Sequence, residues 1–302
     1  MLSSTVTLAQ FLTSTQPESA PKGAFESAQR TLIDTLGVAL AGLADPTAAP
    51  VDQWLATIGG TPSCTVWGRT KGASVAEAAF ANGVRAHALD FDDSLPSLNG
   101  HPSSVLWPAA LATGEFVGAS GRDVLWAYIL GLEVAGKLGR AVGNGHYAKG
   151  WHPTATVGVF SATATAGRLM QLTSEQMQTA LGIAASQASG LICNFGTMTK
   201  PLHVGHAARS GVLAAFLAKS GFTANAAVFD IKRGFLDAYA GADGSPMTEL
   251  VEELGSEWEI SNPGIYVKRW PCCYCTYRPI GGVLEFLEQH QFRIEDLSLI
   301  HI

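Results

Sequence analysis

The pattern of apolar residues along the chain predicts helices. Between residues 24 and 44 apolar side chains recur every three or four positions, which is the spacing of one face of an α-helix. This stripe consists of Phe25, Ala28, Leu32, Leu36, Ala39 and Leu43. The Asp45-Pro46 pair then ends the helix, because the residue before a proline is disfavoured in the helical conformation.

Further helices are predicted over residues 74–88, 107–117, 124–142, 153–170, 174–189 and 204–218. Two of them open with a capping box, Ser74-x-x-Glu77 and Thr173-x-x-Gln176. Several are apolar on nearly every side and rich in small residues, which is typical of helices buried among other helices. Apart from a short strand-like piece, CTVWG at residues 64–68, residues 1–262 therefore predict one large all-helical domain, and the fold class is mainly α.

The pattern changes near Asn262-Pro263-Gly264. IYVKRWPCCYC begins like a strand, RPIGGVLEFLEQH has a helical pattern, and DLSLIHI alternates like the start of another strand. Residues 263–302 thus predict the beginning of a smaller α+β domain. Because the last strand has barely begun at residue 302, we expect the sequence to be truncated within this domain.

Composition and charge narrow the classes of function. The chain has 302 residues, 47% hydrophobic and 15% charged, which is far too apolar for disorder. Its net charge of −6 and lack of a basic run argue against a nucleic-acid partner. No apolar stretch of about 18 residues predicts a membrane span, and the N-terminus does not resemble a secretory signal. The five cysteines form a poor disulfide framework, so we expect a cytoplasmic protein.

The first candidate for chemistry is LDFDDSLPSLNGHPSS, residues 89–104. Asp90, Asp92 and Asp93 resemble calcium ligands, but an EF-hand needs a Glu twelve positions along, where this chain has His101. The acids could instead belong to a solvated helix end, although acidic residues there oppose the helix dipole. We interpret the loop as functional, with no metal.

Two His-Pro pairs, His101-Pro102 and His152-Pro153, each precede a helix rich in small residues. A proline is tolerated in the first helical turn, so each histidine is expected at a helix N-terminus. There the dipole lowers the pKa of an imidazole and attracts anions. Two neutral histidines would suit acid–base chemistry on a carboxylate, and the alternative is that they only cap their helices.

Lysines and cysteines supply further candidates. Lys200 stands before a proline and could pair with a substrate carboxylate, or be an ordinary surface lysine. His203 and His206 follow it without an acidic partner and are interpreted as supporting residues. Lys268 is a possible second carboxylate clamp. The cysteines at positions 272, 273 and 275 lack the second pair that a zinc site needs, and GxSxG, GxGxxG and P-loop motifs do not occur.

Taken together, these motifs resemble the MmgE/PrpD family. The resemblance rests on DTLGVALAG, ANGVRAHALDFDD, the HPSS that follows it, GWHPTATVG, TKPLHVGHAARSG and VKRWPCC, in that order. It implies a large helical domain with a smaller α+β lid, a homodimer, an active site between the domains, and small di- or tricarboxylate substrates handled without metal or organic cofactor. The family positions with catalytic or substrate-binding roles correspond to Asp90, Ser94, His101, His152, Lys200 and Lys268.

The resemblance also suggests roles. His152 and His101 would act as base and acid, Asp90 would orient His101, and the two lysines would bind carboxylates and stabilise enolate-like charge. Ser94 would add a hydrogen bond to substrate. Cys273 would line the substrate site where the family's cis-aconitate decarboxylases have a histidine, which disfavours decarboxylation here.

The favoured reaction is therefore a dehydration like that of 2-methylcitrate dehydratase. The Pro-Cys-Cys segment also resembles the family's iminodisuccinate epimerases, although Tyr277 stands where they have a histidine, so an epimerase remains an alternative. A truncated, non-catalytic protein that dimerises and a zinc module built on the cysteines also remain open.

Overall fold

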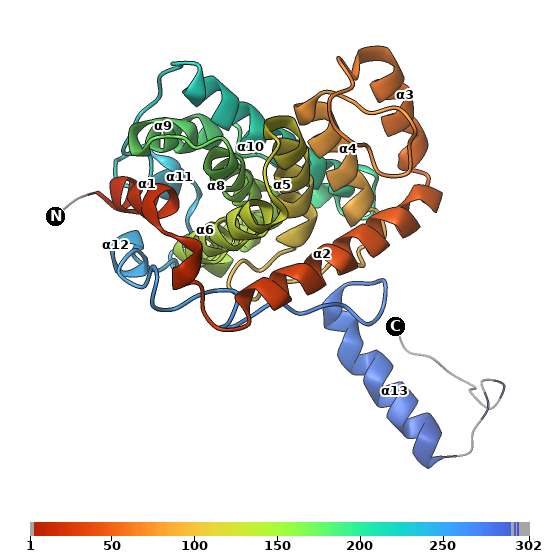
Figure 1. Ribbon diagram of the computed structural model, residues 1–302. Helices are drawn as coiled ribbons and strands as arrows, with labels where there is room; N and C mark the ends of the chain where they lie inside the picture. The colour runs from red at the N-terminus through yellow and green to blue at the C-terminus, as the bar shows by residue number, and fades with distance from the viewer. Residues whose placement is uncertain (1–2, 291–292, 294, 296–302) are drawn as a thin grey trace.

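The computed structural model describes residues 3–290, 293 and 295, and over them the fold is a bundle of helices (Figure 1). The α-helices are α1 (Ser4–Ser14), α2 (Ala24–Ala41), α3 (Ala48–Ile58), α4 (Val75–His87), α5 (Ser103–Val117), α6 (Gly121–Ala148), α7 (Pro153–Thr156), α8 (Gly158–Leu169), α9 (Ser174–Ala185), α10 (Thr199–Lys219), α11 (Phe235–Tyr239), α12 (Met247–Leu250) and α13 (Tyr277–Gln289). Short 3₁₀ turns are η1 (Pro17–Ser19), η2 (Gly42–Ala44), η3 (Ile192–Asn194) and η4 (Tyr274–Thr276).

Helices α10 and α8 lie at the centre of the bundle, where α10 packs against α4, α5, α8 and α9. Small residues allow this close packing. A Cβ added at Gly83 of α4 would lie 2.9 Å from Cα of Gly205 of α10, so the two backbones nearly touch. The helix α8, built largely of Ala, Thr and Gly, is buried on almost every side, as its sequence predicted.

Most of the predicted helices are confirmed, with shifted ends. The helix predicted to start at residue 204 begins five residues earlier as α10, because Pro201 falls in its first turn, where proline is tolerated. The helix predicted to end at residue 142 breaks at Gly143, which has φ of 67°. The predicted capping box at Thr173 and Gln176 is formed.

Two local predictions within the bundle are wrong. The side chain of Ser74 makes no capping bond, its main-chain N–H donates to the carbonyl of Gly59, and Glu77 pairs with Arg209 of α10. The strand-like piece at residues 64–68 forms only a single bridge between Cys64 and Ala73, and no sheet is present in the described part of the chain.

The apolar stripe predicted for α2 does face the bundle. Ala28 and Ala39 are buried, and Phe25, Leu32 and Leu36 pack against buried clusters. The pattern did not select the buried threonines on this side of the helix, such as Thr31, whose hydroxyl accepts a hydrogen bond from the Trp107 indole at 3.1 Å.

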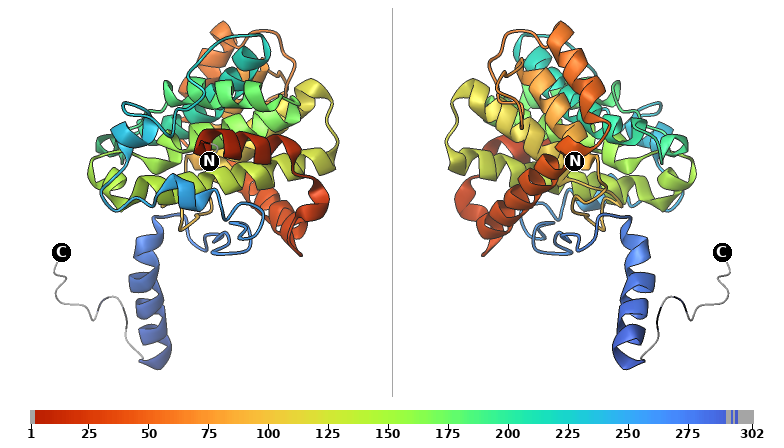
Figure 2. Two further views of the ribbon diagram at one scale, coloured as in Figure 1. Left: turned by 90° about the vertical axis from the view of Figure 1, so that its left-hand side faces the viewer. Right: turned by 90° about the vertical axis from the view of Figure 1, so that its right-hand side faces the viewer.

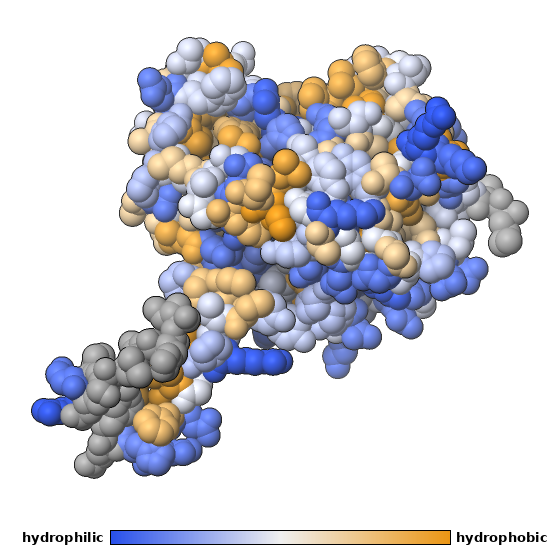
Figure 3. All heavy atoms as spheres, turned by 180° about the vertical axis from the view of Figure 1, so that it is seen from behind, coloured by the Kyte–Doolittle hydropathy of each residue, from blue (hydrophilic) through white to orange (hydrophobic). Residues whose placement is uncertain are grey.

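The segment after the bundle pairs with the loop between α4 and α5 and ends in α13, which projects away from the bundle (Figures 1 and 2). The predicted helix is thus confirmed, whereas the predicted strand before it forms only a single bridge, between Tyr266 and Ser94. Apolar side chains of α13, including Val283 and Leu287, are exposed (Figure 3). The strand predicted for DLSLIHI lies outside the described residues, and the division into domains at residue 262 stays a prediction.

Among the described residues, no individual helix has the length and apolar character to cross a membrane. The bent pair formed by residues 24–44 and 48–58 would pass on length and composition alone.

The close approach of α4 and α10 gives a testable expectation. Gly83→Ala should lower the free energy of unfolding by about 1–3 kcal/mol, because the new methyl group meets backbone atoms that have no side-chain freedom to move away. Urea denaturation followed by circular dichroism measures this. The matched control is Gly37→Ala on α2, where a Cβ meets nothing within 4 Å, and a gain of about 0.5–1 kcal/mol is expected from helix propensity. Equal effects at the two positions would contradict the packing argument.

Candidate active site

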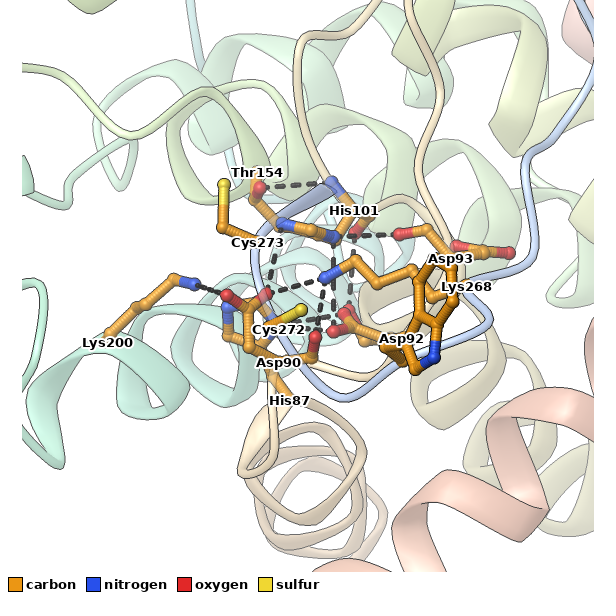
Figure 4. A network of polar contacts seen from close by, with 12 residues as sticks. His87, Asp90, Asp92, Asp93, His101, Thr154, Lys200, Lys268, Cys272 and Cys273 are labelled. Atoms are coloured by element: carbon orange, nitrogen blue, oxygen red, sulfur yellow. Dashed lines mark hydrogen bonds and ion pairs between the residues drawn. The ribbon is translucent and has the colours of Figure 1, made fainter. Parts of the chain in front are cut away.

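The loop between α4 and α5 carries the first part of the candidate site. Asp90 lies just after α4 with φ of 49°, in the left-handed region that Asp tolerates better than most residues. Its main-chain N–H donates to the carbonyl of His87 at 3.2 Å, which closes a tight turn. This turn directs the Asp90 carboxylate toward α10 and the C-terminal segment (Figure 4).

Three nitrogen atoms surround the Asp90 carboxylate, one from the same loop and two from distant parts of the chain. Lys268 Nζ lies 2.7 Å from Oδ1, and Lys200 Nζ lies 3.0 Å from Oδ2. His101 Nε2 is 3.6 Å from Oδ1. Burial acts to raise the pKa of Asp90, but His101 and the two lysines outweigh it, so the pKa lies below its usual range. The carboxylate is therefore ionised at neutral pH.

Lys268 is tied to Asp90 more tightly than Lys200 is. Its ammonium also donates to the main-chain carbonyl of Asp90 at 2.6 Å, and only 1% of its side chain is exposed. Lys200 lies in the first turn of α10 with 16% of its side chain exposed, and its Nζ lies 5.1 Å from the centre of the Phe195 ring. Of the two, Lys200 is the more accessible to a ligand.

His101 lies two residues before α5, and its imidazole is held by a main-chain oxygen. Nδ1 is 2.7 Å from the carbonyl of Asp93, and because a carbonyl only accepts, Nδ1 carries the proton. Nε2 is then the unprotonated nitrogen of the neutral ring. Burial, reinforced by the charges of His87 and Lys268, lowers the pKa of His101 to about 4.

His152 lies at the N-terminus of α7, as predicted, but its buried side chain makes no capping hydrogen bond. Nδ1 lies 3.2 Å from Nδ1 of His203 on α10, and the edge of its ring meets Phe195. Burial and the neighbouring histidines place its pKa well below the usual range. The predicted cause was the helix dipole, and this is corrected: burial is the largest contribution for both histidines.

Asp92 and Asp93 are adjacent and completely buried, yet their environments differ. Asp92 accepts from His87, with both carboxylate oxygens within 2.9 Å of Nδ1. Burial acts to raise the pKa of Asp92, but His87 and His101 outweigh it and hold the pKa far below its usual range. The Asp93 carboxyl meets the hydroxyl and N–H of Ser103, and burial raises its pKa to about 8. Asp92 is therefore ionised and Asp93 protonated at neutral pH.

The structure brings Asp90, His101, Lys200 and Lys268 into direct contact, and places His152 nearby. Two other predicted residues lie differently. Ser94 is held by its backbone, which pairs with Tyr266 in both directions at 2.9 and 3.0 Å. Cys273 is exposed on the segment after Lys268 (Figure 4), and its role toward substrate stays a prediction. All five cysteines are free.

Sequence reasoning did not select His87, which lies in the last turn of α4 and contacts both Asp92 and the ring of His101. A histidine in the last turn of a predicted helix, five residues before a buried acid, was the available signal. His203 was taken as a supporting residue, and its contact with His152 agrees with that interpretation.

Four side chains in this cluster, His87, Asp90, Asp92 and His101, have possible metal-ligand atoms within 4.8 Å of one another. The partners of these side chains argue against a metal, because the Asp90 carboxylate already pairs with the Lys268 ammonium and the Asp92 carboxylate with His87. A cation would have to displace a lysine from a buried position. The absence of a metal requirement remains a prediction.

A buried network of charged residues fixes the rest of the loop. Ser97 donates to Glu259 at 2.5 Å, and the main-chain N–H of Glu259 donates to Glu133 on α6. Lys137 Nζ lies 3.3 Å from Glu259 and 3.0 Å from Glu253. Burial raises the pKa of Glu133 to about 8, so the network holds one acid in its neutral form. The loop that carries Asp90 and His101 is thus anchored to α6.

Replacing Asp92 or Asp93 should change how stability depends on pH, in opposite directions for the two residues. The stability contributed by neutral Asp93 is present in acid and is lost as the pH rises from about 4 to about 8. The Asn side chain in Asp93→Asn is uncharged at every pH, so the variant does not lose this stability. The difference in free energy of unfolding between variant and wild type should therefore shift in favour of the variant as the pH rises, by about 1–3 kcal/mol at pH 8. Chemical denaturation at pH 5 and pH 8 measures the difference.

Asp92→Asn is the matched comparison. The contribution of ionised Asp92 is present above its unfolded pKa and is lost only as the pH falls through its low folded pKa. Its replacement should cost about 3–5 kcal/mol at pH 7, and the cost should shrink in acid. If both variants shifted in the same direction with pH, the assigned charge states would be wrong.

Known proteins are similar to this chain over most of its length. The model of the MmgE/PrpD N-terminal domain matches residues 6–247. Cis-aconitate decarboxylase of Homo sapiens is 32% identical over 258 residues, which is 83% of this chain and 53% of that protein. Cis-aconitate decarboxylase of Aspergillus terreus is 30% identical over 275 residues, 87% of this chain and 56% of that protein. The chain thus spans about half the length of these curated relatives, and by the extent of the domain match it belongs to the MmgE/PrpD family.

Proposed function

We propose that this chain carries the helical part of the active site of a lyase that moves a proton next to a carboxylate of a small di- or tricarboxylate. The observation that carries the proposal is the set of cationic and imidazole nitrogens around Asp90. The proposal includes a homodimer and the absence of metal and organic cofactors, as the family resemblance implies.

The charges favour an anionic substrate. The ammonium groups of Lys200 and Lys268 contribute two positive charges, and Asp90 cancels only one of them. A substrate carboxylate that approaches Lys200 would neutralise the remaining charge. Because the site is largely shielded from water, such a charge-assisted contact is stronger than at an exposed surface. The same lysine could stabilise negative charge that develops on the substrate during proton removal.

The histidines suit proton transfer. Nε2 of His101 is unprotonated, since Nδ1 is committed to the Asp93 carbonyl, so it can accept a proton. The imidazolium that forms would lie 3.6 Å from the Asp90 carboxylate, which would stabilise it. Asp90 therefore acts on the charge of His101, while the Asp93 carbonyl orients its ring. His152, also neutral, would serve as the partner acid or base.

Two reactions are candidates within this class. Dehydration of a 2-methylcitrate-type substrate combines proton removal with loss of a hydroxyl group, and we propose it first. Decarboxylation of cis-aconitate is the second, because the similar proteins from Homo sapiens and Aspergillus terreus are named for that reaction. Both reactions develop negative charge next to a carboxylate, which the two lysines would stabilise.

The proposal is tested by incubating the protein in D₂O with 2-methylcitrate, citrate, cis-aconitate and iminodisuccinate and following products and solvent exchange by NMR. With the active substrate, His101→Gln should lower kcat by about 10²–10⁴-fold, because a positioned base is lost. Lys200→Met should raise KM by about 10–100-fold, the worth of one charge-assisted contact.

Lys219→Met, at the other end of α10, is the matched control, since its ammonium donates to the Met170 carbonyl, away from the site. It should leave both kinetic constants within about twofold, as expected for a surface change. Full turnover in His101→Gln, or no reaction of the wild type with any of these carboxylates, would refute the proposal. Exchange without net product would favour an epimerase.

A further inference from the structure

The buried pair formed by His87 and Asp92 lies at the centre of the histidine cluster without an assigned role. Its rings and charges are close to both proposed acid–base groups. The centroid of the His87 ring lies 4.9 Å from that of His101 and 6.0 Å from that of His152. Rings at these separations are in contact, so His87 is a neighbour that the two histidines share.

Asp92 fixes the orientation of His87. Both carboxylate oxygens lie within 2.9 Å of Nδ1, and both side chains are completely shielded from solvent. Because Asp92 is ionised and can only accept, Nδ1 carries a proton. Histidine–carboxylate pairs of this type hold an imidazole in one tautomer and one orientation.

The other nitrogen of the ring is unusual. Nε2 of His87 is buried and has no hydrogen-bond partner among the described residues. Leaving a buried polar atom unpaired costs about 1–3 kcal/mol. The pairing with Asp92 uses Nδ1 alone and gives no reason for this cost at Nε2. The rings of His101 and His152, which contact His87, are the neighbours through which it could have a further role.

We propose that His87, held by Asp92, is a positioning residue of the active site, which fixes the rings of His101 and His152 and keeps both of them free of the proton before substrate binds. This inference rests on the proposed function only in naming those two rings as the acid–base groups. His87 itself is too buried to touch a substrate and acts through its neighbours.

Charge is the means by which it acts. As an imidazolium, protonated on both nitrogens, His87 repels a proton on His101 or His152, and this repulsion contributes to the low pKa of each. The surrounding charged and titratable groups are Asp34 on α2, Asp90, Asp92 and His101 on the loop, His152 before α7, Lys200 and His203 on α10, and Lys268 on the C-terminal segment.

Loss of His87 would make protonation of His101 more favourable. Asp92 Oδ1 lies 3.9 Å from Nδ1 of His101, and without His87 that charge would lack its nearest counter-charge. The carboxylate would then attract a proton to His101. Nε2 of His101 would be protonated, and so unable to act as a base, up to a higher pH than in the wild type. The acid limb of the pH–rate profile would move to higher pH.

The experiment uses His87→Asn, whose amide NH₂ takes the place of Nδ1–H and keeps a donor toward Asp92. Proton–carbon NMR of the histidine rings follows the titration of His101 and needs no substrate. We expect its midpoint to rise by about 1–2 pH units, the size of shift that one nearby charge produces. With the active substrate, the acid limb of kcat should shift by the same amount, while kcat at pH 8 falls by less than about tenfold.

His146→Asn is the control for a merely structural role. His146 is equally buried, but both of its nitrogens have partners, the Tyr239 carbonyl and the Thr156 hydroxyl. Its replacement should lower the melting temperature without moving the His101 titration. An unchanged His101 midpoint in His87→Asn, together with a pH-independent loss of kcat, would overturn the inference. Because the titration is read without turnover, it stands or falls separately from the proposed reaction.

Nitrogen-15 NMR of the wild type gives a second test should His87→Asn fail to fold. At pH 6 the rings of His101 and His152 should both be neutral, and both nitrogens of His87 should be protonated. An imidazolium at either site histidine at this pH, or a neutral His87 ring, would equally overturn the inference.

Discussion

The contact between Lys268 and Asp90 joins the segment after the helical bundle to a loop 178 positions earlier in the chain. The buried ammonium donates both to the Asp90 carboxylate and to the Asp90 main-chain carbonyl. A buried charge requires such partners, because its desolvation is costly and is repaid only by close, well-directed contacts. The turn at Asp90, the direction of its carboxylate and the course of residues 264–270 therefore depend on one another.

The loop around Asp90 shows how three acids of one short motif reach three different states. Asp90 remains partly exposed and is shared by two lysines, so it is ionised. Asp92 is buried but ionised, because a histidine contacts both of its oxygens. Asp93 is buried against a serine and keeps its proton. Partners, more than burial itself, decide the charge of each acid.

The helical bundle provides the rigidity that such a site needs. Glycines and alanines bring α4 and α10 into backbone contact, and these are the helices that carry His87 and Lys200. The loop between α4 and α5 is held from the opposite side by Ser97 and the charged network on α6. With its supports on several helices, the site keeps its groups at fixed distances, which is the condition for acid–base chemistry.

The amino-acid sequence alone determined the helical class, most of the helices, and the motif positions of Asp90, His101, His152, Lys200 and Lys268, because periodicity and residue type are properties of short segments. It failed at the capping box of Ser74, where Glu77 pairs with a residue distant in the chain, and it did not select Thr31, which a bond from Trp107 allows to be buried. Only the tertiary structure showed that burial is the largest cause of the low pKa values of His101 and His152. It also showed that His87 lies beside them. Burial and charge contacts arise from residues distant in the chain, so no local pattern encodes them.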